Sequence, residues 1–93
     1  MAERGRFLEG LIYPFYIFPY TEETNERVMK ILQEFEQKLR ENKIRYSVST
    51  FAWSIRVYIS KKDKSKVDKD LIWELEKIHH KQFAVIAKDY SQN

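Results

Sequence analysis

The spacing of apolar and polar residues predicts two amphipathic helices. Over residues 22–42 the apolar positions recur every three or four residues, which places them on one face of a helix. Thr21 can cap the start of this helix, and Asn42 is a left-handed stop at its end. The same spacing predicts a second helix over residues 65–81. Both helices then have one apolar side to bury and one charged side in water.

Residues 44–60 alternate apolar and polar positions, which predicts two strands. The apolar positions change from even to odd numbers: Ile44, Tyr46 and Val48 are followed by Trp53, Ile55, Val57 and Ile59. A hairpin with an even-length loop brings both sets to one face. If Thr50 and Phe51 form the turn, Val48 lies opposite Trp53. A four-residue loop from Thr50 to Trp53 gives the same facing.

Two further strands complete the predicted fold. One covers residues 15–20 with Pro14 at its start, and the other covers Phe83–Ala87. The order strand, helix, strand, strand, helix, strand predicts an α+β, ferredoxin-like βαββαβ fold, with a four-stranded antiparallel sheet and both helices on one face. Residues 11–93 form this single domain. Residues 1–10 carry mixed charge without periodicity, so we expect a flexible N-terminal arm.

Composition limits the chemistry that such a domain can perform. The 93 residues include no cysteine, which excludes disulfides and thiolate sites. Lysine and arginine (17) exceed aspartate and glutamate (14), so the net charge of +3 suits an acidic partner. The longest uncharged stretch, from Gly10 to Thr21, is too short to span a bilayer. We expect a cytoplasmic protein that does not bind membranes.

The uncovered face of the predicted sheet carries the candidate nucleic-acid-binding residues. Two arginines share this face with aromatic side chains: Tyr16, Phe18, Arg45, Arg56 and Tyr58. On the first strand either Tyr16 and Phe18 or Phe15 and Ile17 must point to this face, and the more polar tyrosine favours the first pair. Bases stack on aromatic rings for about 1–3 kcal/mol each, and arginines neutralise phosphates. The loop before the second helix adds four lysines that can assist: Lys61, Lys62, Lys64 and Lys66. The same face would equally suit a homodimer interface, and a lysine-rich loop can simply be a solvated turn.

Two segments are similar to those of the RNA-recognition motif family. Tyr16–Ile17–Phe18 resembles the first motif of that family, on the first strand. The segment from Phe51 to Tyr58 resembles its second motif, on the third strand. The resemblance implies the same order of elements and aromatic residues on the two central strands.

Three other aromatic residues are candidate partner-binding residues. Phe51 and Trp53 lie at the tip of the predicted hairpin, where a turn cannot easily bury them. Trp73 lies off the apolar stripe of the second helix, so it can anchor a partner. It can also pack under the stems of Lys69 and Lys77, which requires no partner.

The sequence contains no recognisable catalytic or metal-binding arrangement. His79 and His80 follow Glu76 by one helical turn, but one helix does not supply a complete metal site. Nucleophilic triads, phosphate-cradling glycine loops and paired carboxylates are missing. We therefore expect no enzyme activity, no metal and no cofactor.

These observations lead to two hypotheses. The first is a non-enzymatic domain that binds single-stranded nucleic acid through the uncovered face and the lysine-rich loop. The alternative is a small homodimeric protein-interaction module, an accessory factor or inhibitor of the kind that viruses and mobile elements encode. In that case the uncovered face or the hairpin tip forms the interface.

Overall fold

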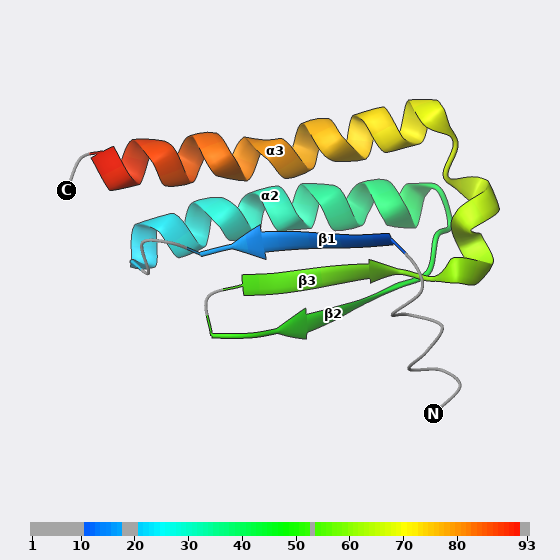
Figure 1. Ribbon diagram of the computed structural model, residues 1–93, viewed down its shortest axis with the longest axis horizontal. Helices are drawn as coiled ribbons and strands as arrows, with labels where there is room; N and C mark the ends of the chain where they lie inside the picture. The colour runs from blue at the N-terminus through cyan, green and yellow to red at the C-terminus, as the bar shows by residue number, and fades with distance from the viewer. Residues whose placement is uncertain (1–10, 18–20, 53, 92–93) are drawn as a thin grey trace.

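The computed structural model describes residues 11–17, 21–52 and 54–91. It shows an α+β fold with a three-stranded antiparallel sheet and two helices (Figure 1). The elements follow in the order β1 (Leu11–Tyr16), α2 (Glu22–Glu41), β2 (Tyr46–Thr50), β3 (Ser54–Ile59), the 3₁₀ helix η1 (Lys61–Lys66) and α3 (Lys69–Ser91). The predicted N-terminal arm, Phe18 and Trp53 lie outside the described residues.

The strand order in the sheet is β1-β3-β2, with both pairs antiparallel. Phe15 lies opposite Ile55 in the first pair, and Val48 lies opposite Val57 in the second. Because side chains alternate along a strand, these odd positions of β1 and β3 share one face with the even positions of β2. That face meets the helices.

The hairpin is confirmed, but its predicted register is wrong. Val48 pairs with Val57 and not with Trp53. The amide of Phe51 donates to the carbonyl of Ser54 at 2.7 Å, so the chain reverses between these two residues. The register differs from the predicted one by an even number of residues. The apolar sets of the two strands therefore still share one face, as predicted.

The predicted fourth strand is wrong, because Phe83–Ala87 lie within α3. No glycine or proline occurs between Lys69 and Ser91, so nothing in the sequence breaks the helix. A short apolar run cannot be distinguished from a buried helical segment by its periodicity. The structure thus has three strands, and the ferredoxin-like topology is not confirmed.

Several element boundaries also differ from the prediction. β1 begins at Leu11, before Pro14, and α3 begins at Lys69 because residues 61–66 form η1. Helix α2 is confirmed, with the Thr21 hydroxyl accepting a hydrogen bond in its first turn. The left-handed residue after α2 is Lys43 (φ 56°), one position beyond Asn42.

The hydrophobic core lies between the sheet and the two helices. The Phe35 ring of α2 contacts the rings of Tyr13 and Phe15, with centroids 5.0 Å and 5.2 Å apart. From α3, Leu75 is fully buried in the same cluster. Burying one side chain of the size of leucine or phenylalanine contributes about 1.5–3 kcal/mol, so the contacts of Phe35 and Leu75 supply a major part of the stability.

Helix α3 packs along the outer edge of β1, where the fourth strand was expected. Gln82 is fully buried there. Its Oε1 accepts a hydrogen bond from the amide of Tyr16 at 2.6 Å, and its Nε2 donates to the carbonyl of Pro14 at 2.9 Å. His79 Nε2 also donates to the Pro14 carbonyl, at 2.6 Å, since a carbonyl can only accept. The Gln82 amide thus replaces a peptide group of the missing strand. Pro14 has no N–H, so it fits an edge without losing a bond.

Candidate nucleic-acid interface

Positive charge is concentrated in the hairpin and η1. Residues 43–66 contain seven basic residues and one acidic residue, a net charge of +6. Helix α2, by contrast, contains six acidic and four basic residues. Because the whole chain has a net charge of +3, the rest of it is net negative. The charge is therefore strongly asymmetric, which favours an anionic partner at the hairpin and η1.

The sheet face opposite the core is open and carries no carboxylate. Ile12 and Tyr16 of β1 are 44% and 42% exposed on this face. Arg56 of β3 is exposed and is the one charged residue in the three strands. Ser49 lies opposite Arg56 and contributes a hydroxyl. A polyanion can therefore approach this face without repulsion from the strands.

Tyr16, Ser54 and Phe51 form a row across the three strands at the hairpin end of the open face. Tyr16 pairs with Ser54, and the amide of Phe51 bonds to the Ser54 carbonyl. β1, which carries Tyr16, and the residue that follows β2, Phe51, are separated by β3, so their backbones lie about 10 Å apart. Ser54 is a small residue between them. The row therefore resembles a slot with aromatic sides and a small polar floor.

Arg56 lies next to this row and is oriented by an aromatic contact. Its guanidinium carbon lies 4.4 Å from the centre of the Phe51 ring, which is 46% exposed. Among the described residues, no carboxylate pairs with Arg56. Stacking on an aromatic ring leaves the N–H edge of a guanidinium available for phosphate or base atoms.

Arg45 is held at the other end of the hairpin by a buried carboxylate. Its Nε and Nη2 donate to Asp63 at 2.9 Å and 3.0 Å, and its amide donates at 2.7 Å. Asp63 is 2% exposed, whereas the Arg45 side chain is 65% exposed. The hydrogen bonds from Arg45 hold the pKa of the Asp63 carboxyl well below its usual range and raise the pKa of Arg45. Two donors of the Arg45 guanidinium, and the amide of Arg45, are thus already in use.

Asp63 also fixes η1, the predicted lysine-rich loop. Lys66 Nζ lies 3.4 Å from Asp63 and donates to the carbonyl of Lys43 at 3.0 Å. The remaining lysines of η1 are exposed: Lys61, Lys62 and Lys64. A buried acid therefore holds a short helix whose lysines point outward, and the sequence pattern did not show this role of Asp63.

The predicted aromatic platform is only partly assembled. Tyr58 lies on the open side of β3 by alternation, but it is 8% exposed and is not presented to solvent. The Tyr16 ring lies 6.4 Å from that of Phe83 on α3, at the edge of the sheet. Phe83 is 46% exposed and was not predicted to be at the surface. The exposed aromatic groups of the open face are therefore at its hairpin end.

Trp73 is distant in sequence from these residues and lies on α3. It is 60% exposed, and Lys77 Nζ lies 4.4 Å above the centre of its ring. The predicted packing under a lysine is thus present. The exposed ring remains available to a partner.

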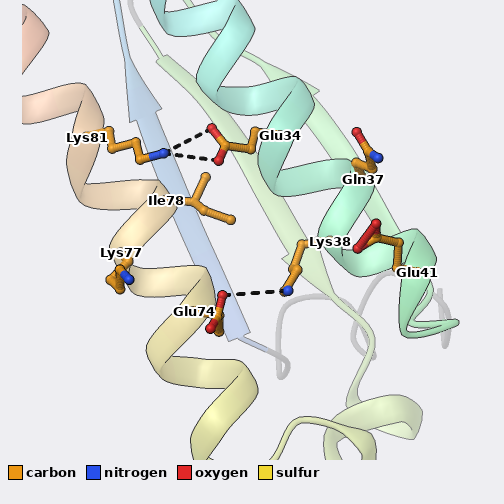
Figure 2. A pocket seen from close by; sticks show the side chains of 8 residues that line it. All are labelled: Glu34, Gln37, Lys38, Glu41, Glu74, Lys77, Ile78 and Lys81. Atoms are coloured by element: carbon orange, nitrogen blue, oxygen red, sulfur yellow. Dashed lines mark hydrogen bonds and ion pairs between the residues drawn. The ribbon is translucent and has the colours of Figure 1, made fainter.

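A charged groove separates α2 and α3 (Figure 2). Lys81 bonds to Glu34 at 3.0 Å, and Lys38 pairs with Glu74 at 3.6 Å. Ile78 lies between these two ion pairs, in a groove of about 320 Å³. Both signs of charge are paired across the helices, so the groove shows no preference for an anion.

Within the described ranges, no three histidine, aspartate or glutamate side chains come together as metal ligands. No helix in the described part of the chain is long and apolar enough to cross a membrane.

Comparison with known proteins gave no match. No family model matches the chain, and neither the curated proteins nor the solved structures include a significant match. The function is therefore inferred from geometry and charge.

Proposed function

We propose that the protein binds single-stranded nucleic acid, without catalysis, across the open face of the sheet. The observation that carries this proposal is Arg56, stacked on Phe51 beside an exposed tyrosine on a face without carboxylates. The guanidinium supplies a phosphate or base contact, and the two rings supply stacking surfaces. These are the two components of sequence-tolerant recognition of single strands.

The arrangement of the row favours unpaired bases. An unstacked base fits over Ser54, with Phe51 on one side and Tyr16 on the other. In a duplex the faces of the bases are already stacked and unavailable, so rings on a flat sheet cannot reach them. The exposed lysines of η1 would then neutralise phosphates farther along the strand.

The proposal is tested by measuring the fluorescence anisotropy of labelled single-stranded and duplex oligonucleotides over a range of salt concentrations. We expect Phe51→Ala to weaken binding of the single strand about 5- to 150-fold, the loss of one stacking contact. Trp73→Ala removes an even more exposed ring from α3 and is the control; the affinity of this variant should not change. Equal affinities for Phe51→Ala and the unmodified protein would refute the proposed slot.

The lysines of η1 are tested separately. Replacing Lys61, Lys62 and Lys64 with glutamine should flatten the dependence of log affinity on log salt, since each lost phosphate contact removes about 0.7 from the slope for a single strand. Lys66 is left unchanged because it bonds to Asp63. A slope that does not change would exclude η1 from the interface.

A homodimer through the open face is the competing proposal. It predicts a stable dimer in light scattering that does not respond to nucleic acid at low salt. It also predicts that Arg56→Gln changes the oligomeric state rather than affinity for an oligonucleotide. These two results together would show that the open face forms a dimer interface and does not bind nucleic acid.

A further inference from the structure

The two edges of the sheet differ in how they are covered. The edge of β1 is bonded to Gln82 and His79 of α3. At β2, the carbonyl of Arg45 accepts from Ser60, and the amide of Phe51 donates to Ser54. Odd-numbered residues of β2 therefore bond to β3, and the N–H and C=O groups of the even-numbered residues point outward. We call this outer side of β2, from Tyr46 to Thr50, the β2 edge.

In the described part of the chain, no hydrogen bond reaches the outward backbone groups of the β2 edge. Sheet edges are usually protected by a charge, a proline, a bulge or a covering helix. β2 (YSVST) contains no charge and no proline. Its pairing with β3 is regular from Tyr46 to Thr50, so it has no bulge. The β2 edge is thus a template for an added strand.

The side chains of the β2 edge also leave apolar surface uncovered. Val48 lies on the core-facing side, opposite the fully buried Val57, yet it is 40% exposed. The helices therefore cover β3 more completely than β2. An apolar side chain from an added strand would cover Val48 and extend the core by one strand.

Charge decides which occupant fits the β2 edge. No acidic residue occurs between Asn42 and Lys62. At one end of the edge, Arg40 Nη1 donates to the hydroxyl of Tyr46 at 2.8 Å. Arg45 directly precedes Tyr46 in the chain. At the other end, Arg56 leans over Phe51 on the open face.

A second copy of the chain would be repelled from this edge. β2 itself is uncharged, so two paired β2 edges would repel through the basic residues near them, Lys43, Arg45 and Arg56, of which Arg45 is already paired with Asp63. Salt screens such charges only in part when they lie within the Debye length of about 8 Å at physiological salt. An acidic strand would be attracted by the same field.

We propose that the β2 edge accepts an extended acidic segment of a protein partner as a fourth strand. Side chains of the added strand alternate between the two sheet faces. Apolar residues would cover Val48 on the helix side, and carboxylates would face Arg45 and Arg56 on the open side. Backbone hydrogen bonds supply the affinity, and the alternation of apolar and acidic residues supplies the specificity.

The experiment uses a labelled synthetic peptide that alternates valine and aspartate, and a second peptide with lysine in place of aspartate. We expect fluorescence anisotropy to show binding of the first peptide and none of the second. N-methylation of the backbone amides that would pair with β2 should weaken binding about ten-fold or more, since a hydrogen-bond donor is lost. Equal binding of the methylated peptide, or binding of the lysine peptide, would overturn the proposal.

Val48→Pro tests the same contact from the side of the protein. Proline removes the outward N–H of residue 48 but none of the bonds to β3, which odd-numbered residues make. We expect about ten-fold weaker peptide binding, while thermal unfolding shows that the variant is folded. Tyr16→Ala damages the proposed nucleic-acid slot on β1, the strand farthest from the β2 edge, and should leave peptide affinity unchanged, so the two proposals can fail independently. Self-association that Val48→Pro abolishes would identify a second copy as the occupant and overturn the acidic segment.

Discussion

Replacing Gln82 with methionine is a direct test of the contact between α3 and the edge of β1. The side chains are similar in size, so the change creates no large cavity. It removes the bond to the Pro14 carbonyl, which keeps its bond from His79, and leaves the amide of Tyr16 without its partner. A lost hydrogen bond costs about 1 kcal/mol, and an unsatisfied buried group costs about 1–3 kcal/mol. We therefore expect the free energy of unfolding to decrease by about 2–4 kcal/mol.

This loss is a large fraction of the stability of a small domain, which is about 5–15 kcal/mol. It corresponds to a decrease in Tm of about 8–32 °C for a chain of this size. Urea unfolding and thermal unfolding followed by circular dichroism measure both quantities. Gln33→Met, at an exposed position of α2, is the matched control and should change the stability by less than about 0.5 kcal/mol.

Gln82→Glu separates the two bonds of the side chain. The carboxylate keeps an acceptor for the Tyr16 amide but loses the donor to Pro14, and burial of its charge adds a penalty. We expect this variant to be less stable than the unmodified protein near neutral pH. The difference in stability between the two proteins should decrease on acidification, because the protonated carboxyl of Gln82→Glu can again donate to the Pro14 carbonyl. If Gln82→Met and Gln82→Glu both matched the unmodified protein at neutral pH, α3 would not be bonded to the edge of β1.

Three further predictions concern ionisable groups and the start of α2. Burial lowers the pKa of His79 below 6.5, so the unfolded chain takes up its proton first and stability should fall as the pH decreases below about 6.5. In urea titrations His79→Gln should flatten this fall. The Asp63 carboxylate, whose pKa is lowered, contributes stability that is complete above its ordinary pKa of 3.8 and is lost as the pH falls further. Asp63→Asn should therefore be less stable than the unmodified protein near neutral pH, and its free energy of unfolding should decrease less on acidification. Thr21→Ala removes the cap of α2 and should cost about 1 kcal/mol in urea unfolding, while Thr21→Ser retains most of it.

Local patterns predicted the elements whose signals lie within a few neighbouring residues. The capped helix from Glu22 to Glu41 was predicted to within one residue because its apolar spacing and its cap are both local. The shared face of the hairpin was also predicted, because the alternation of side chains survives an even change of register. The register itself depends on the geometry of the turn, which the residues between Phe51 and Ser54 do not encode by any known turn signal.

The candidate site was predicted in part. Alternation assigned Arg56 to the open face, and the polarity of its hydroxyl favoured the same face for Tyr16; both residues are exposed. Nothing in the sequence indicated that Asp63 would be buried beneath Arg45, since the two residues come together only when η1 folds back on the start of β2. The burial of Tyr58 could not be predicted from the alternation of a strand either. Alternation shows to which face of the sheet a side chain points, but not what covers it there.

The sequence by itself determined the amphipathic helices, the facing of the hairpin and the basic charge between Lys43 and Lys66. Periodicity, capping and charge are properties of the chain before it folds. Only the tertiary structure decided that Phe83–Ala87 continue α3 instead of forming a fourth strand. An apolar run of that length satisfies either structure locally. The outcome depends on partners far away in the chain, because the Gln82 amide bonds to β1 across 66 and 68 residues of sequence. Those bonds cover one edge of the sheet with a helix and leave the β2 edge open.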